Sequence, residues 1–229
     1  MFTVVTGAGG ALGRTLVRAL AAQGHKVACV DRTEESVREL AKEISGVVGV
    51  VVDARPESFA AMVADCEAKA NERVTGAALV AGGWAGGKPL HAGDASFASM
   101  LEANALTVHA ALLGLLPGMV ERRAGSVVVV GSRNVERPWL GANAAGYTAS
   151  KAAAVSLAQA AAAEVLASRV RVNAVLVSTM DTAANRKAMP DVDPSTWVST
   201  ESVSSVITFL LSDAARDVSG AEIPIYGRA

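Results

Sequence analysis

The sequence predicts an α/β fold: a single domain with a doubly wound parallel sheet of about seven strands and helices on both faces. Short valine-rich runs alternate with longer alanine-rich stretches along all 229 residues. Several short runs, such as VVVV at 127–130, are apolar at every position, which is typical of parallel strands buried on both faces. No internal repeat, low-complexity tract or linker interrupts the pattern, so we expect one domain, 1–229.

The first half of the chain predicts three strand–helix units. The strands are expected at 2–6, 26–30 and 47–52, and the helices at 11–23, 34–44 and 56–70. Gly24 suits the position after the first helix, and Pro56 suits the first turn of the third.

The second half continues the alternation. We expect strands at 77–81, 126–130, 170–175 and 222–225, and helices at 96–122, 144–167 and 200–211. Right-handed crossovers between parallel strands leave ligand sites at the carboxyl ends of the strands. Residues that carry chemistry should therefore follow a strand or lie on the helix after it.

Composition argues against several classes of partner. A formal net charge of −1 provides no general attraction to nucleic acid or an anionic membrane. Three scattered histidines lack metal-ligand spacing, so we expect no metal site. Two cysteines are too few for a disulfide framework. The apolar stretch 103–120 contains Asn104 and Pro117, which favours a buried helix over a membrane span. An apolar strand without a preceding basic region predicts a cytoplasmic protein.

A glycine-rich turn, TGAGGALG at 6–13, joins the first strand to the first helix. Glycines allow a tight turn and close approach to a pyrophosphate, and the helix N-terminus supplies N–H groups and a positive dipole end. An ordinary strand-to-helix turn is the alternative. Because an acid follows the next strand, we expect a Rossmann-type dinucleotide site whose residues are Gly7, Gly9, Gly10, Ala11, Leu12 and Gly13.

That acid is Asp31, at the end of the second predicted strand. Its carboxylate would accept hydrogen bonds from ribose hydroxyls and repel a 2′-phosphate, which favours NAD(H) over NADP(H). The adjacent Arg32 would tolerate the phosphate, so NADP(H) stays open. Asp53, after the third strand, suits either the adenine edge or the cap of the following helix.

Tyr147 and Lys151 lie four residues apart near the start of a long predicted helix, so their side chains leave the same face. A nearby ammonium favours the phenolate and lowers the phenol pKa, as proton exchange with a carbonyl or alcohol oxygen requires. Ser132, just past the fifth predicted strand, is placed to polarise the substrate oxygen. Together these residues predict hydride-transfer chemistry.

With these motifs the chain resembles the short-chain dehydrogenase/reductase family over its whole length. The matching segments are 6–13, Asp53, LVAGG at 79–83, Asn104, Ser132, YTASK at 147–151, 172–182 and 218–227. The resemblance implies a catalytic tetrad and further cofactor contacts. The tetrad is Asn104, Ser132, Tyr147 and Lys151, and the contacts come from Ala81, Gly82, Gly83, Tyr147, Lys151 and Thr182. It also implies a homodimer or homotetramer.

Three features depart from the family pattern. Ala11 stands where the middle glycine is usual, and Val177-Ser178 replaces a Pro-Gly. The interval from Ser132 to Tyr147 is about two residues longer than usual, so Asn134 falls at the usual serine distance. Ser132 is our choice for the site because the loop can absorb an insertion.

AGGWAGG at 81–87 and the run 185–197 resemble a branch of the family, the quinonoid dihydropteridine reductases. Trp84 would offer a stacking plane for a flat substrate, or would pack under a lid expected at about 178–199. A pterin-like substrate and a small carbonyl or alcohol both stay open. A dinucleotide-sensing protein without catalysis is the remaining alternative, against which the Tyr147–Lys151 pair argues.

Overall fold

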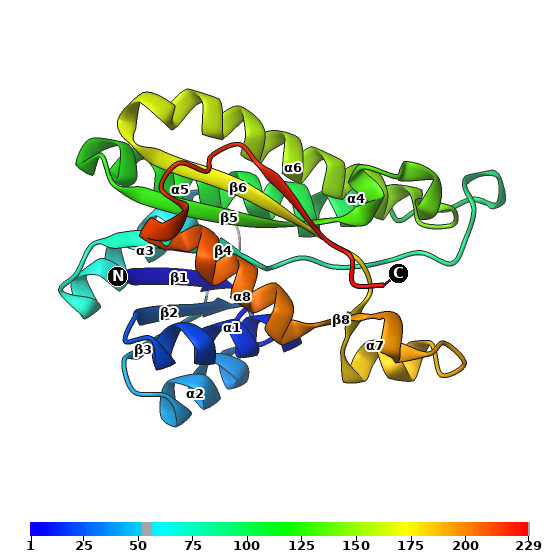
Figure 1. Ribbon diagram of the computed structural model, residues 1–229, viewed down its shortest axis with the longest axis horizontal. Coiled ribbons are helices and arrows are strands. Elements are labelled where there is room, and N and C mark those ends of the chain that lie inside the picture. Colours follow the sequence, from blue (N-terminus) through cyan, green and yellow to red (C-terminus); the bar gives the residue numbers. More distant parts are fainter. Residues whose placement is uncertain (52–55, 229) are drawn as a thin grey trace.

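The computed structural model describes residues 1–51 and 56–228. Within them a central sheet of seven strands, all parallel, has the order β3-β2-β1-β4-β5-β6-β9 (Figure 1). The strands are β1 (Phe2–Thr6), β2 (Lys26–Asp31), β3 (Val47–Val51), β4 (Val74–Leu79), β5 (Gly125–Ser132), β6 (Val170–Val177) and β9 (Glu222–Ile225). The chain reverses its direction of travel across the sheet between β1 and β4, where such folds bind ligands beyond the strand ends. The predicted fold class is confirmed.

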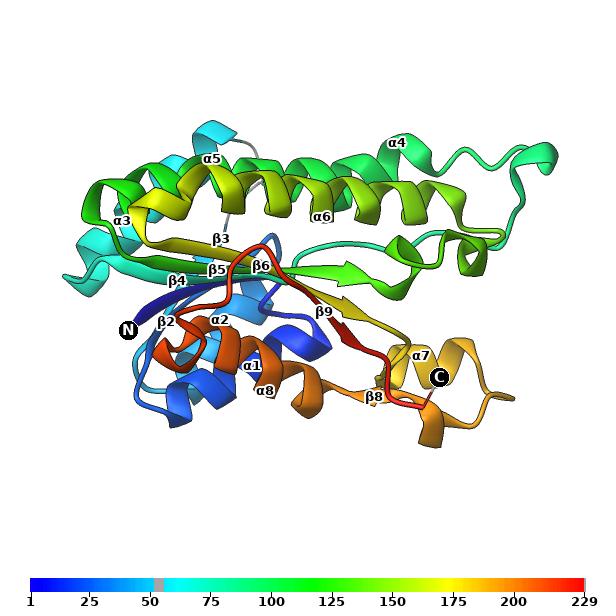
Figure 2. The same ribbon diagram turned by 45° about the horizontal axis from the view of Figure 1, so that its top comes forward.

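Helices cover both faces of the sheet (Figure 2). One face carries α3 (Pro56–Ala70), α4 (Phe97–Met100), α5 (Thr107–Arg122) and α6 (Ala145–Val165). The other carries α1 (Ala11–Ala22), α2 (Glu34–Glu43) and α8 (Thr200–Leu211).

Two large hydrophobic cores lie under the two helical layers, and the central strands supply alternate residues to each. In β5, Val127 and Val129 belong to the core under α3, α5 and α6, whereas Val128 and Val130 belong to the core under α1 and α8. Alternation of side chains across a strand is what makes a wholly apolar run suit a sheet covered on both faces. Full burial of one such valine contributes roughly 1.5–3 kcal/mol.

Strand β4 begins earlier than the sequence indicated, at Val74 rather than residue 77, and ends at Leu79 rather than 81. A β-carbon on Gly76 would lie 2.7 Å from the Thr3 hydroxyl oxygen, so glycine here serves close strand packing. A glycine that looks like part of a loop is therefore a strand residue.

The predicted helix 96–122 is interrupted. Between α4 and α5, residues Leu101–Leu106 form a π-helical turn, η2. The segment Phe97–Arg122 is long and apolar enough to cross a membrane by length and composition. In the structure it lies on the sheet and packs against α3 and α6, in agreement with the predicted buried helix.

The segment expected as a lid holds more regular structure than the sequence indicated. It contains α7 (Ala183–Ala188) and two short paired strands, β7 (Met180–Asp181) and β8 (Val198–Ser199). These elements lie beyond the carboxyl end of β6 (Figure 2). Their place suits a cover for a site at that edge, and the lid role stays a prediction.

Candidate active site

The end of β5 and the first turns of α6 bring three of the predicted site residues together. Ser132 is the last residue of β5, and α6 carries Tyr147 and Lys151 one turn apart. Ser132 and Lys151 are 5% and 7% exposed. The Ser132 hydroxyl lies near enough to the Tyr147 phenol to influence its pKa. A hydroxyl pair of this kind can share a substrate oxygen between two donors.

The electrostatics of the pair differ from the sequence expectation. Burial raises the pKa of Tyr147, and the neighbouring Ser132 hydroxyl only partly opposes that rise. Burial also lowers the pKa of Lys151 to about 8, and its Nζ donates to the Val130 carbonyl oxygen over 2.8 Å. The expected lowering of the phenol pKa by the ammonium is therefore absent from this structure. The amine is bound to a backbone carbonyl, and its own charged form is disfavoured by burial.

Asn104 lies in the π-helical turn η2 and is 1% exposed. Its Oδ1 accepts from the Gly83 N–H at 3.0 Å, and its Nδ2 donates to the Gly83 carbonyl at 3.1 Å. Nδ2 also donates to Ser150 Oγ at 3.0 Å. π turns recur at functional sites. Here the turn contains the asparagine that connects the loop after β4 to helix α6.

Gly82 lies between this asparagine and the lysine. A β-carbon at Gly82 would come within 2.5 Å of Asn104 Oδ1 and 3.2 Å of Lys151 Nζ. The two polar groups thus approach the chain at the same point, and only glycine leaves room for both. Through this contact the loop 81–83, which was expected to bind the cofactor, lies next to α6 and its Tyr147–Lys151 pair.

The two additional residues between Ser132 and Tyr147 are accommodated in two short 3₁₀ turns, 133–135 and 138–141. Asn134 donates through Nδ2 to Thr148 Oγ1 at 3.1 Å, and its backbone N–H donates to Ser132 Oγ. The hydroxyl beside the phenol is thus that of Ser132, and the Asn134 amide is directed to Thr148.

The glycine turn has the close backbone contacts that its residues suggested. Gly7 has φ +65°, and a β-carbon there would lie 2.8 Å from the Ala81 backbone. A β-carbon on Gly13 would lie 2.2 Å from the Gly7 carbonyl oxygen. Helix α1 follows at Gly10 without a side-chain cap and without an acidic residue in its first turn. Its first N–H groups are thus left to an anionic ligand, as a pyrophosphate cradle requires.

Asp31 lies beside this turn, where β2 ends. Its Oδ2 accepts from the Gly9 N–H at 3.0 Å and its Oδ1 from the Thr33 N–H at 3.1 Å. Arg32 is exposed. The position of Asp53 lies outside the described residues.

One contact joins the glycine turn to the loop after β4. Thr6 Oγ1 accepts from the Ala81 N–H at 3.1 Å. The chain then continues to Gly82 and Gly83, which contact Asn104 and Lys151. The glycine turn and the phenol–amine pair thus meet at the same edge of the sheet, and the residues along that edge fit a dinucleotide.

Two predicted residues lie apart from this network. Thr182 caps α7, with its Oγ1 accepting from the Asn185 N–H at 3.1 Å. Trp84 is 67% exposed, with its ring beside Gly86, so it does not pack under the lid.

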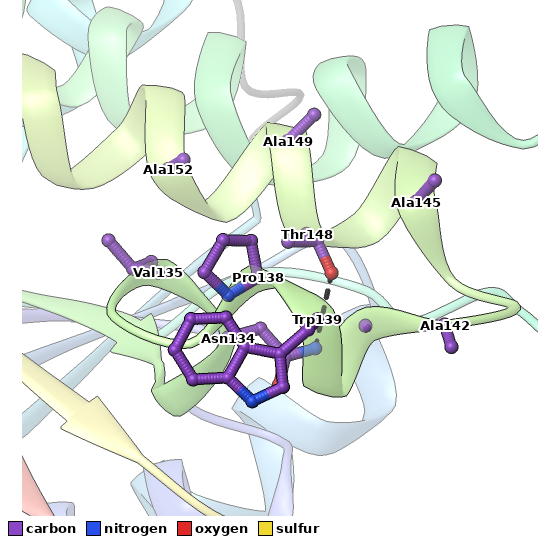
Figure 3. Close-up of a pocket in the computed structure, with 10 residues that line it drawn as sticks. Asn134, Val135, Pro138, Trp139, Ala142, Ala145, Thr148, Ala149 and Ala152 are labelled. Atoms are coloured by element: carbon purple, nitrogen blue, oxygen red, sulfur yellow. Dashed lines mark hydrogen bonds between the residues drawn. The ribbon is translucent and has the colours of Figure 1, made fainter.

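A pocket of about 550 Å³ lies between α6 and the loop after Ser132 (Figure 3). It is lined by Asn134, Val135, Pro138, Trp139, Gly141, Ala142, Ala145, Thr148, Ala149 and Ala152. On α6, Ala145, Ala149 and Ala152 leave a different face from Tyr147 and Lys151 at 100° per residue. The pocket is therefore separate from the hydroxyl pair, and no motif in the sequence indicated it.

Sequence reasoning also missed Ser150 and the Val130 carbonyl. Ser150 is completely buried on α6 and directly precedes Lys151 in the sequence. A serine inside YTASK has no signal of its own in the sequence, because its partner Asn104 is 46 residues away. The Val130 carbonyl likewise has no signal in the sequence, because every residue carries a backbone carbonyl.

Comparisons with known proteins identify relatives of the whole chain. A family model described as short chain dehydrogenase matches residues 2–193. L-xylulose reductase of Bos taurus is 31% identical, covering 98% of this chain and 94% of the relative. Galactitol 2-dehydrogenase (L-tagatose-forming) of Cereibacter sphaeroides is 30% identical, covering 97% and 92%.

Comparison with solved structures also identifies relatives of the whole chain. A short-chain dehydrogenase/reductase family oxidoreductase from Burkholderia thailandensis is similar with a TM-score of 0.84 and 31% identity, covering 99% of this chain and 91% of that one. An NAD⁺-bound xylitol dehydrogenase shares the fold, with a TM-score of 0.89 and 21% identity, covering 99% and 97%. The chain therefore belongs to the short-chain dehydrogenase/reductase family of NAD(P)-dependent oxidoreductases.

Proposed function

We propose that this enzyme interconverts a small ketone and the corresponding secondary alcohol, with Tyr147 as the general acid and base. The observation that carries the proposal is the approach of the Ser132 hydroxyl to the Tyr147 phenol at the carboxyl edge of the sheet, with Lys151 one helical turn along α6. In reduction, Ser132 and Tyr147 both donate hydrogen bonds to the substrate carbonyl oxygen. Tyr147 then transfers its proton to that oxygen as the C–H bond forms at carbon.

The raised pKa of Tyr147 suits this direction, because the phenol is protonated at neutral pH and so able to donate. The nicotinamide of a bound cofactor would supply the hydride for reduction and accept it in oxidation. The phenolate left after reduction recovers a proton from Lys151, which is next to it on α6. Asn104 holds Gly83, and through it the loop that borders the lysine.

Different residues along the carboxyl edge of the sheet would bind different parts of the cofactor. Gly7, Gly9 and Gly13 allow the backbone approach, and the N–H groups of Ala11 and Leu12 at the start of α1 would meet the pyrophosphate. The loop 81–83 and Lys151 would border the nicotinamide and its ribose, and Thr182 its carboxamide.

We propose a preference for NAD(H). Asp31 is held in place by two backbone N–H groups, so its negative charge cannot turn away from a 2′-phosphate without losing both bonds. Arg32 is exposed and would have to offset that charge across solvent. We expect kcat/KM for NADH to exceed that for NADPH by about 10-fold or more, which corresponds to roughly 1.4 kcal/mol. Equal values would contradict the assignment.

Polyhydroxylated ketones and the corresponding polyols are the substrate class that the relatives favour, because these include an L-xylulose reductase and an L-tagatose-forming galactitol 2-dehydrogenase. A quinonoid dihydropterin enters as the competing candidate, because Trp84 exposes a flat indole in the loop after β4. A panel of ketoses, simple ketones and quinonoid dihydropterin, followed by NADH oxidation, separates the two classes.

The acid–base role is tested by comparing the chain's two tyrosines. Tyr147→Phe removes the proton donor and keeps the ring, and we expect kcat to fall about 10²–10⁴-fold. Tyr226→Phe is the matched control, since the Tyr226 hydroxyl bonds Glu136, and it should retain activity within about two-fold. Full turnover by Tyr147→Phe would refute the role. Binding of dinucleotide without turnover of any substrate would favour a sensing protein.

We also propose a cytoplasmic homodimer or homotetramer. Helices α5 and α6 form an outer layer of the molecule (Figure 2), and α5 leaves Leu113 52% exposed. Trp139, which lines the pocket between α6 and the loop after Ser132, is 71% exposed. Apolar side chains in such positions suit a contact between subunits. Light scattering after gel filtration measures the assembly, and a monomer at micromolar concentration would contradict it.

A further inference from the structure

Ser150 is completely buried on α6, between Tyr147 and Lys151. Its hydroxyl donates to the Tyr147 carbonyl oxygen at 2.7 Å, a bond back to the preceding turn of the helix. With its hydrogen used there, Oγ presents its lone pairs to Asn104 Nδ2 at 3.0 Å. Ser150 is thus an acceptor whose direction is set by the helix backbone.

The amide of Asn104 makes three hydrogen bonds to nitrogen and oxygen atoms, besides a 3.9 Å contact from Nδ2 to Met100 Sδ, and the three bonds require the same orientation of the amide. Gly83 contributes an N–H to Oδ1 and a carbonyl to Nδ2. Ser150 accepts the second hydrogen of Nδ2. A flipped amide would place Nδ2 against the Gly83 N–H and would bring its oxygen to the hydroxyl that is already donating elsewhere. Ser150 and Gly83 together select a single rotamer.

That rotamer determines where Oδ1 lies. Asn104 Oδ1 and Lys151 Nζ lie 2.5 and 3.2 Å from the β-carbon position of Gly82. A changed amide would alter both the position of the Gly82–Gly83 loop and the polar surroundings of the lysine. Because Asn104 and Ser150 are 1% and 0% exposed, water has no access to replace the lost bond.

We propose that Ser150 is a positioning residue: it fixes the Asn104 amide, and through it the loop that borders the nicotinamide. This inference rests on the proposed function for its catalytic consequence but not for its structural one. Ser150 itself is completely buried, with its hydroxyl bonded to Asn104 and the Tyr147 carbonyl, so we assign it no contact with cofactor or substrate. Its effect on turnover passes entirely through Asn104.

The first test measures the loop without activity. Hydrogen–deuterium exchange of peptides covering residues 80–88 is compared in the wild type and Ser150→Ala. We expect exchange at the Gly83 amide to become about 10-fold faster or more. The matched control is Ser204→Ala, which removes a buried hydroxyl on α8 that has no hydrogen-bond partner among the described residues. Unchanged exchange in Ser150→Ala, or equal acceleration in the control, would overturn the proposal.

The second test is a double-mutant cycle on kcat. We expect Ser150→Ala to lower kcat about 10-fold or more, in keeping with the cost of a misplaced group near the reacting atoms. In an Asn104→Ala background the same change should have no further effect. Independent, additive losses would show that Ser150 does not act through Asn104. If the wild type turns over no substrate, the proposed function fails, whereas the exchange result still decides the role of Ser150.

Discussion

Replacing Lys151 by methionine removes a buried charge and keeps most of the length of the side chain. The lysine is 7% exposed, and burial lowers its pKa from 10.5 to about 8. Each pKa unit corresponds to about 1.4 kcal/mol, so the charged form carries a penalty of about 3 kcal/mol below pH 8. Against this, methionine leaves the Val130 carbonyl without its donor, at a cost of about 1–3 kcal/mol.

At pH 7 the variant should therefore be between equally stable and about 2 kcal/mol more stable than the wild type, while its turnover falls. The pH dependence is the sharper expectation. Because the folded state binds the Lys151 proton less tightly than the unfolded chain, wild-type stability gains from this group as pH rises from 8 to 10.5. Across that window the free energy of unfolding of the wild type should rise by about 3 kcal/mol relative to Lys151→Met.

Urea unfolding followed by circular dichroism at pH 7, 8, 9 and 10, at one protein concentration, measures this difference. Lys187→Met, at an exposed lysine of α7, is the control and should show no such trend. A difference between wild type and Lys151→Met that stays constant from pH 8 to 10 would refute the reasoning. So would a relative loss of wild-type stability as pH rises.

Three further predictions follow from contacts around the site. Gly13→Ala places a β-carbon 2.2 Å from the Gly7 carbonyl oxygen and should lower the Tm by at least about 4 °C. Gly10→Ala is the control: its β-carbon would lie 3.3 Å from the same oxygen, so its Tm should fall by less. Equal shifts of the two variants in thermal unfolding would contradict this. Asp31→Ala removes the acceptor of two backbone N–H groups and should lower the NADH-over-NADPH ratio of kcat/KM by about 10-fold, measured by initial rates; an unchanged ratio would oppose it. Burial and the Glu136 carboxylate raise the pKa of Tyr226 to about 12. Ultraviolet titration of the wild type minus Tyr226→Phe should therefore show its ionisation above pH 11, and ionisation near pH 10 would contradict this.

The family chemistry was visible in the sequence because it depends on near neighbours in the chain. Tyr147 and Lys151 share a helix face through their four-residue spacing, and the glycine turn follows directly from a strand that ends at residue 6. The same local reasoning failed where a contact crosses the sheet. Gly76 resembled a loop residue because nothing in its own segment shows that Thr3 occupies the space beside it.

By itself, the sequence determined the alternation of strands and helices, the place of the dinucleotide turn, and the pairing of phenol and amine on a single helix. Periodicity and spacing act over a few residues, and that range is enough for these features. Only the tertiary structure decided that Ser132 rather than Asn134 meets the phenol, and that the Lys151 amine is bound to Val130. It alone decided that a π-helical turn brings Asn104 to Gly83 and Ser150. Those contacts join residues that are 14 to 46 positions apart in the sequence, so they depend on how strands and helices are packed together and not on any short pattern.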